Sequence, residues 1–335
     1  MTTALITGLT GMVGSHLADY LLDNTDWDIC GFLRWDDRLT NIEHLMPTIN
    51  AGDRVRLIYG DLNDLSSLLR ALEESDPDYI FHLAAQSYPQ TSFVAPLDTL
   101  ETNILGTAKL LDAVRVLKKD PVIHVCASSE VFGRVPPEFL PIHEDVIFHP
   151  ASPYAISKVG TDLVGRFYAE AYGLTVMTTR MFTHTGPRRG DVFAESTFAK
   201  QIAMIEAGQQ EPVIKVGNLE SLRTWSDVRD AVRAYHMLVT IDPIPGEYYN
   251  IGGTYTCKVA DMLKYLINLS TVDNITIRLD PDRLRPIDAD LQVPDTTKFT
   301  KHTGWIPEIS FETTMNDLLN YWRDNVAKGN NYLSR

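Results

Sequence analysis

The feature that most constrains this chain is the alternation, through its first half, of short apolar runs with longer segments of helical period. The runs hardly alternate between apolar and polar residues, which is typical of strands buried on both faces of a sheet. Strands that alternate with helices along the chain are typical of βαβ units and a parallel sheet. We expect strands at residues 4–6, 27–33, 55–59, 79–83, 122–127 and 175–179, and helices at 13–22, 65–74, 97–118 and 154–172.

The pattern changes near residue 180, where Pro and Gly cluster in HTGPRRGD. A helical stretch follows at 198–207, and residues 248–251 are expected as one more strand that returns to the first unit. A chain of 335 residues is long enough for two units. The predicted fold is therefore α/β, with a doubly wound parallel sheet of Rossmann type and a smaller mixed α/β C-terminal domain. The expected ranges are 1–180 plus about 224–252 for the first unit, and 181–223 plus 253–335 for the second.

Composition excludes several classes of partner. With 30 Lys and Arg against 44 Asp and Glu, the net charge is −14, so a broad basic surface for nucleic acid or an anionic membrane is not expected. No apolar run reaches 18 residues, and the N-terminus lacks the pattern of a secretion signal. The three cysteines are far apart, without a CxxC pair or a His/Cys cluster, which argues against a disulfide framework and a metal site. We expect a cytoplasmic protein without a membrane or nucleic-acid partner.

A glycine turn follows the first expected strand directly, in TGLTGMVG, with the spacing GxxGxxG. Between a strand and a helix, such glycines permit a tight turn, let a pyrophosphate approach the backbone, and let helix and strand pack closely. The helix N-terminus adds free N–H groups and partial positive charge. A tight turn without a ligand is the alternative, but the position inside a βα unit favours a dinucleotide. The expected contacts are Gly8, Thr10, Gly11, Met12, Val13 and Gly14.

The residue after the second strand predicts which dinucleotide binds. An acidic side chain there binds the ribose of NAD, whereas a basic one accommodates the 2′-phosphate of NADP. Arg34 occupies this position and favours NADP; the alternative is that Arg34 is solvated and Asp36 contacts the ribose. Further cofactor contacts are expected after the third and fourth strands, at Asp61, Leu62, Leu83 and Ala85.

Tyr154 and Lys158 are four residues apart in an expected helix and therefore lie on one face. The Lys ammonium can stabilise the Tyr phenolate and lower the phenol pKa from its usual value of about 10. Such a base suits removal of a hydroxyl proton while hydride leaves the same carbon. Alone, the pair is equally typical of a helix surface, but CASSE at residues 126–130 would meet it at the carboxyl edge of the sheet.

Together these motifs resemble the extended short-chain dehydrogenase/reductases, the NAD-dependent epimerase/dehydratase family. Within that family the chain resembles the GDP-mannose 4,6-dehydratases over nearly its whole length. The stretches that carry the resemblance are RWDDRLTNIEHL, AAQS, ASSEVFG, SPYAISK, GPRRG, GNLESLRTW and LRP. A GDP-4-keto-6-deoxymannose reductase and a GDP-heptose 4,6-dehydratase are the alternatives. A non-catalytic NADP sensor is disfavoured, because Ser128, Glu130, Tyr154 and Lys158 are all present.

The resemblance implies a lyase that converts GDP-D-mannose to GDP-4-keto-6-deoxy-D-mannose. It makes Ser128, Glu130, Tyr154 and Lys158 catalytic. Tyr154 would take the proton of the sugar 4-hydroxyl as hydride passes to NADP⁺, and Ser128 would hydrogen-bond the 4-oxygen. Glu130 would remove the C5 proton and help the 6-hydroxyl leave as water. Because the hydride then returns to C6, NADP is expected to stay tightly bound and to be regenerated in each cycle.

The resemblance also implies how a GDP-sugar binds. Arg223 and Arg285 would hold the diphosphate, because guanidinium groups form bidentate bonds. Asp288 would bind the ribose, and Ser87, Ser129 and Glu130 complete the substrate set, while His184 and Arg189 join the cofactor set. Thr183, Thr197 and Lys200 depart from the pattern of the dehydratases. The loop at residues 34–45 reaches a neighbouring subunit in those enzymes, so a homodimer or homotetramer is expected.

Overall fold

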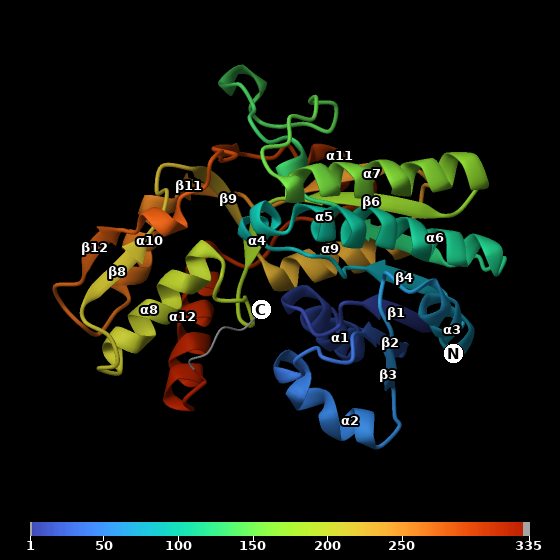
Figure 1. The fold of residues 1–335 in the computed structure, drawn as a ribbon, viewed down its shortest axis with the longest axis horizontal. Helices are drawn as coiled ribbons and strands as arrows, with labels where there is room; N and C mark the ends of the chain where they lie inside the picture. The colour runs from blue at the N-terminus through green and yellow to red at the C-terminus, as the bar shows by residue number, and fades with distance from the viewer. Residues whose placement is uncertain (1, 331–335) are drawn as a thin grey trace.

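The computed structural model describes residues 2–330; residue 1 and the last five residues of the expected second unit, 331–335, lie outside the described residues. Seven parallel strands form the main sheet, in the order β3-β2-β1-β4-β5-β6-β10 (Figure 1). The chain reverses direction across the sheet between β3 and β4, so β1 and β4 flank the switch point at which ligands of such sheets bind. The strands are β1 (Thr3–Thr7), β2 (Asp28–Leu33), β3 (Val55–Tyr59), β4 (Tyr79–His82), β5 (Val122–Cys126), β6 (Val176–Met181) and β10 (Tyr248–Ile251).

Helices cover both faces of this sheet, which confirms the expected doubly wound arrangement. Apolar residues of α1 and α9 form the core on one face, and those of α3 and α6 form the core on the other. The helices of this unit are α1 (Met12–Asn24), α2 (Met46–Asn50), α3 (Leu65–Ser75), α4 (Pro89–Val94), α5 (Pro96–Leu100), α6 (Gly106–Val116), α7 (Pro153–Tyr172), α9 (Val228–Thr240) and α11 (Thr297–Thr303).

The expected strands and helices are present, with one internal difference. The helix predicted at 97–118 is divided into α5, a π-helical turn η2 (Glu101–Leu105) and α6. Gly106, at the start of α6, lies where a Cβ would come within 2.9 Å of the Leu62 side chain. Helical periodicity alone does not reveal such a turn, because a single π-helical turn inside an α-helix is too short to establish a period of its own.

A second, smaller unit carries its own apolar core between three helices and short strands. The boundary expected between residues 223 and 224 falls inside β9, which pairs with β7, β11 and β13. Strands β8 and β12 pair separately. The elements are α8 (Ala194–Glu206), α10 (Val259–Asn268), α12 (Phe311–Ala327), β7 (His184–Thr185), β8 (Val213–Val216), β9 (Leu222–Asp227), β11 (Tyr255–Lys258), β12 (Thr276–Leu279) and β13 (Leu291–Gln292).

A long loop joins β5 to α7 and is held against the sheet by a buried ion pair. The Arg180 guanidinium donates to the Asp162 carboxylate at 2.7 and 3.2 Å and to the backbone oxygen of Glu144 at 2.7 Å. The His149 N–H donates to the Val131 oxygen at 3.1 Å, which closes the loop beside the expected catalytic segment. None of the helices within residues 2–330 is both long and apolar enough to span a membrane.

Candidate active site

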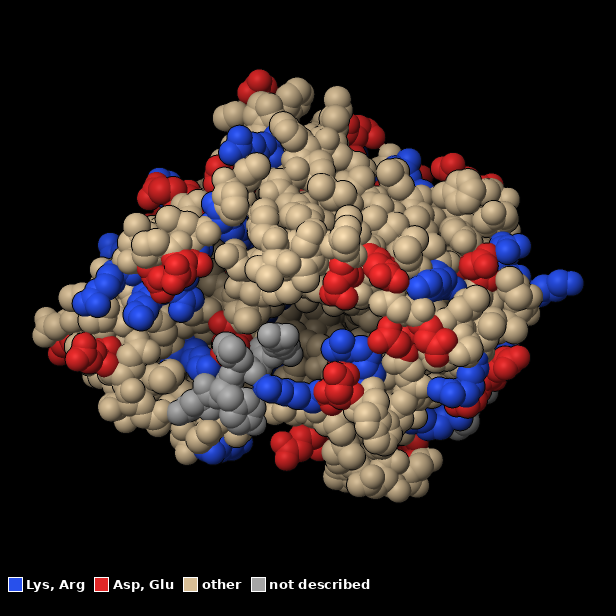
Figure 2. Space-filling view, in the orientation of Figure 1, with Lys and Arg blue, Asp and Glu red and all other residues tan. Residues whose placement is uncertain are grey.

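A cavity of about 430 Å³ lies at the carboxyl edge of the main sheet and is lined by both units. Figure 2 shows a hollow near the middle of this face, with basic side chains beside it. Most of the residues expected from sequence line the cavity: Gly8, Gly11, Met12, Val13, Gly14, Leu83, Ala85, Ser87, Ser128, Ser129, Glu130, Tyr154, Lys158, His184, Arg189, Arg223, Arg285 and Asp288. Four expected cofactor contacts do not line it: Thr10, Arg34, Asp61 and Leu62.

The glycine turn has the geometry that a pyrophosphate requires. Gly8 has a φ of +76°, which favours glycine, and a Cβ at Gly14 would lie 2.3 Å from the carbonyl oxygen of Gly8. Gly11 is the N-cap of α1 and supplies no side-chain hydrogen bond to the first turn. The helix N-terminus therefore faces the cavity with backbone N–H groups that no cap side chain occupies, and this arrangement fits a dinucleotide.

The four expected residues outside the lining have identifiable local roles. The Arg34 guanidinium and the Thr10 hydroxyl both donate to the Asp37 carboxylate. The Asp61 carboxylate accepts a hydrogen bond from the Asn63 N–H at 2.8 Å. Leu62 is buried in the core between the sheet and α3 and α6. Their proposed contacts with a cofactor remain predictions.

Tyr154 and Lys158 are brought to the cavity by the first turns of α7. The Ser152 hydroxyl caps this helix by accepting the Ala155 N–H at 3.0 Å, and Pro153 occupies its first position. The Lys158 Nζ donates to the backbone oxygen of Cys126 at 2.7 Å and lies 6.0 Å from the centre of the Tyr154 ring. Both side chains are buried, so the helix places a phenol and an ammonium in a site from which water is largely excluded.

Burial changes the proton affinity of both groups. It raises the pKa of the Tyr154 phenol well above its usual value of 10, while a hydrogen bond with Ser128 opposes that rise. Burial also lowers the pKa of Lys158. The structure therefore does not show the expected lowering of the Tyr154 pKa by Lys158, because desolvation of the phenolate outweighs the attraction of nearby charge.

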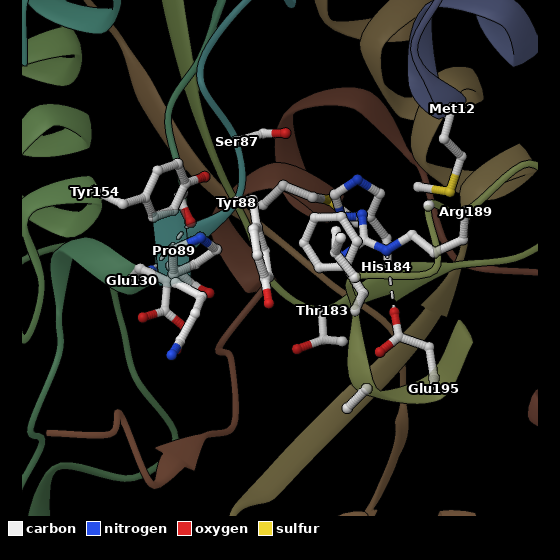
Figure 3. A pocket seen from close by; sticks show the side chains of 18 of the residues that line it. Met12, Ser87, Tyr88, Pro89, Glu130, Tyr154, Thr183, His184, Arg189 and Glu195 are labelled. Carbon is white, nitrogen blue, oxygen red and sulfur yellow. Dashed lines mark hydrogen bonds and ion pairs between the residues drawn. The ribbon is translucent and has the colours of Figure 1, made fainter. Parts of the chain in front are cut away.

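Glu130 lies beside Tyr154 at one end of the cavity (Figure 3). It belongs to a short 3₁₀ turn, η3 (Ser129–Val131), whose N-cap Ser128 accepts the Glu130 N–H at 3.2 Å. The Glu130 Oε1 is 3.6 Å from the Arg223 Nη1 on β9, and both side chains are largely buried. The predicted base and the predicted diphosphate ligand thus face each other across the two units.

A family model described as GDP-mannose 4,6 dehydratase matches residues 5–318. The chain belongs to the GDP-mannose 4,6-dehydratase family.

Relatives named as dehydratases, and one named as a reductase, align with most of this chain. The GDP-mannose 4,6 dehydratase of Drosophila melanogaster is 32% identical over 94% of this chain and 85% of its own length. The GDP-6-deoxy-D-mannose reductase of Pseudomonas aeruginosa is 31% identical over 96% of this chain and 98% of its own length. The solved structure of RMD from Pseudomonas aeruginosa complexed with NADPH has a TM-score of 0.82 and 29% identity, and the match covers 97% of this chain and 100% of that one.

The second unit supplies the remaining expected ligands of a family member. The Arg285 Nη1 is 3.6 Å from the Asp288 Oδ1, and the Asn218 amide donates to the Asp288 Oδ2 at 3.1 Å. His184 lies on β7, and burial lowers its pKa to about 4, so its ring is neutral at pH 7. Within residues 2–330, no group of three or more His, Cys, Asp or Glu side chains is arranged to hold a metal ion.

Two of the departures from the family pattern lie in the cavity. Thr183 and Thr197 both line it. Lys200 is not part of the lining, and its Nζ donates to the Asp191 carboxylate at 2.6 Å. The cavity of this chain therefore differs from the pattern of the dehydratases by two lining threonine hydroxyls. A third difference, Lys200, pairs with Asp191 outside the lining.

Sequence reasoning missed an aromatic contact that spans the cavity. The Arg189 Nε donates to the Glu195 Oε1 at 3.1 Å, and its guanidinium carbon lies 3.4 Å from the centre of the Phe193 ring. The Tyr88 ring meets the Phe193 ring edge-on, with centroids 5.8 Å apart. Tyr88 follows β4 and Phe193 precedes α8, so this contact joins the two units. The only signal in the sequence is that Tyr88 adjoins Ser87 at the end of an expected strand.

Proposed function

We propose that the protein is an NADP-dependent GDP-sugar 4,6-dehydratase, a hydro-lyase that converts GDP-D-mannose to GDP-4-keto-6-deoxy-D-mannose. The observation that carries this proposal is the convergence of Ser128, Glu130, Tyr154 and Lys158 on one cavity whose opposite wall holds Arg223. The first unit would bind the dinucleotide and the second the GDP-sugar. The family match and the Drosophila relative support the activity.

The residues of the glycine turn would hold the cofactor. Backbone N–H groups at the start of α1 would bind its pyrophosphate, and Leu83 and Ala85 would lie beside it at the end of β4. When bound, NADP would supply the hydride acceptor for oxidation at C4 and, once reduced, the hydride donor for C6. The NADPH complex of the Pseudomonas relative supports this choice of cofactor.

Tyr154, in its phenolate form, would begin the reaction by taking the proton of the sugar 4-hydroxyl, and it would become the neutral phenol. The nearby Lys158 ammonium would stabilise that phenolate, and the Ser128 hydroxyl would hydrogen-bond the sugar 4-oxygen. Burial opposes the phenolate, and the Lys158 ammonium would offset part of that cost.

Glu130 would carry out the elimination. A 4-keto group acidifies the neighbouring C5 hydrogen, and the Glu130 carboxylate removes it as the base. The same carboxyl group then donates that proton to the departing 6-hydroxyl, which leaves as water. The diphosphate of the substrate would draw Arg223 away from the Glu130 oxygen at 3.6 Å, and this exchange couples substrate binding to release of the base.

The test is to incubate the purified protein with GDP-mannose and no added cofactor. A dehydratase with bound NADP forms a 4-keto-6-deoxy product, seen by mass spectrometry as the loss of one water, without net change in reduced nicotinamide. Absence of this product, in protein shown to contain NADP, would contradict the proposal for GDP-mannose. The same assay with a GDP-heptose tests the heptose alternative.

The reductase remains the second candidate, because the Pseudomonas reductase is nearly as similar to this chain as the Drosophila dehydratase. A reductase would leave GDP-mannose unchanged. It would instead consume one NADPH for each molecule of a GDP-4-keto-6-deoxy sugar, which absorbance of the nicotinamide measures directly.

An exposed apolar face supports assembly as a homodimer or homotetramer. Leu97 and Leu105 on the α5–η2 segment are 77% and 51% exposed, and Leu163 and Phe167 on α7 are 48% and 53% exposed. These two helical segments pack side by side, so their apolar side chains form one surface. Exposed apolar patches of this kind are typical of protein interfaces, and a second copy would bury the same face in a twofold arrangement.

The three cysteines are free. Free thiols are typical of a reducing compartment, and we propose that the protein acts in the cytoplasm, with GDP-sugars rather than nucleic acids or membranes as its ligands.

A further inference from the structure

Asp37 occupies an unusual position at the carboxyl end of β2. Its Oδ2 accepts the Arg34 backbone N–H at 3.1 Å and the Thr10 hydroxyl at 3.3 Å. Thr10 belongs to the glycine turn, so these bonds fix a carboxylate between the end of β2 and the expected pyrophosphate site. The Asp37 side chain is only 16% exposed, which distinguishes it from a solvated loop carboxylate.

The same carboxylate also holds the guanidinium of Arg34. The Arg34 Nε and Nη2 donate to the Asp37 Oδ1 at 3.1 and 2.9 Å. Asp36, by contrast, is 80% exposed, and its carboxylate lies 3.9 Å from the Arg34 Nε. The sequence left open whether Asp36 contacts the ribose. In the structure, the carboxylate that is held at this strand end belongs to Asp37 rather than to Asp36.

The two members of this pair favour opposite forms of the cofactor. A guanidinium at this strand end binds the 2′-phosphate of NADP, whereas a carboxylate accepts a hydrogen bond from the free 2′-hydroxyl of NAD. A 2′-phosphate must take the Arg34 guanidinium from Asp37, and it then lies near a carboxylate whose charge is no longer paired with that guanidinium. Residues 34–38 hold two arginines and two aspartates, so this segment has no net positive charge to offset repulsion between the Asp37 carboxylate and a phosphate group that carries between one and two negative charges.

We infer that Asp37 is a specificity-determining residue that weakens binding of the 2′-phosphate, so that the site accepts NAD as well as NADP. The inference rests on the cofactor site of the proposed function, but not on the identity of the sugar or on the elimination. A purely structural role, in which Asp37 only ties the glycine turn to β2 through Thr10, is the competing explanation.

Cofactor binding distinguishes the two explanations without an activity assay. The protein, freed of bound nucleotide, is titrated with NADPH and with NADH, and the two Kd values are measured by calorimetry or nicotinamide fluorescence. Asp37→Asn keeps an oxygen that can accept the Thr10 hydrogen bond and removes the charge. Asp36→Asn is the matched control, since it removes the same charge one residue away, where solvent screens it.

Asp37→Asn is expected to raise the ratio of the NADH Kd to the NADPH Kd by about tenfold or more, mainly through tighter NADPH binding. Asp36→Asn should change this ratio by less than about threefold. Equal ratios in wild type, Asp37→Asn and Asp36→Asn, with unchanged melting temperatures, would overturn the inference and leave the proposed function intact. If the wild-type protein binds neither nucleotide, the proposed function itself fails, and the inference with it.

Discussion

At the residue scale, the proposed chemistry depends on two neighbouring groups, Tyr154 and Glu130, that have different surroundings. The Tyr154 phenol contacts Ser128, and the Lys158 Nζ lies over its ring. Burial opposes ionisation of this phenol. Glu130 faces the guanidinium of Arg223. The two surroundings fit two separate proposed roles, with Tyr154, once ionised, as the base at the 4-hydroxyl and the Glu130 carboxylate as the base at C5.

Replacement of Glu130 separates these roles. Glu130→Gln should leave oxidation at C4 detectable, as a rise in reduced nicotinamide on mixing with GDP-mannose. Loss of water should fall by about 10²- to 10⁴-fold, because the amide can neither remove the C5 proton nor return it. Tyr154→Phe is the comparison, since it should lose both signals. Full dehydration by Glu130→Gln would show that another group acts as the base.

At the element scale, two histidines form part of the packing between the central strands and their neighbours. The ring nitrogens of His82 on β4 lie 2.9 Å from the Thr7 hydroxyl and 3.0 Å from the Thr107 hydroxyl. His124 on β5 lies 2.8 Å from the Thr179 hydroxyl. Burial, together with the nearby Lys158, lowers the pKa of both rings to about 3. Both rings are therefore neutral in the folded protein at any pH near 7.

This packing predicts a loss of stability in acid. The unfolded chain takes up these protons near pH 6.5, whereas the folded chain does so only near pH 3, so stability falls as the pH drops below 6.5. Each histidine should lower the free energy of unfolding by about 2 kcal/mol between pH 7 and pH 5. Urea denaturation at both pH values measures the change.

A matched pair of variants isolates the contribution of one histidine. His124→Gln should make the stability difference between pH 7 and pH 5 smaller by about 2 kcal/mol, whatever its effect at pH 7. His143→Gln, at a half-exposed position in the loop after β5, should leave the difference unchanged. An identical pH dependence in wild type and His124→Gln would contradict the burial of a neutral ring.

At the scale of the whole molecule, the candidate active site lies where the two units meet. Arg223 and Arg285 approach from the second unit, while Tyr154 and Glu130 are fixed to the main sheet. The contact between Tyr88 and Phe193 crosses the same space. Movement of one unit relative to the other would therefore change the distance between the proposed base and the proposed diphosphate ligand.

The exposed face of α5–η2 and α7 predicts self-association. The wild type should be a dimer or tetramer by light scattering or sedimentation, and Leu163→Arg should weaken dimerisation at least roughly thirtyfold, because a buried charge at the centre of an apolar interface costs about 2 kcal/mol or more. Ile277→Arg on β12 is the control, since Ile277 is 50% exposed and Leu163 48%. A monomeric wild type, or equal association of both variants, would contradict this interface.

Much of the fold can be predicted from local sequence patterns, namely apolar runs, glycine positions and helical spacing. The apolar runs predict the parallel strands because a strand buried on both faces must be apolar throughout. The turn at Gly8 and Gly14 can be predicted because only glycine fits its backbone contacts. Tyr154 and Lys158 can be predicted to lie together because residues four apart are on the same face of a helix.

The amino-acid sequence by itself therefore determined the order of strands and helices, the glycine turn and the residue types of the catalytic group, since each depends on neighbours close in the chain. Only the tertiary structure decided that Glu130 faces Arg223, that Asp37 rather than Asp36 holds Arg34, and that Tyr88 meets Phe193. It also decided that the Tyr154 pKa is raised rather than lowered. The physical reason is that burial and charge pairing depend on segments far apart in the chain, which only the folded molecule brings together.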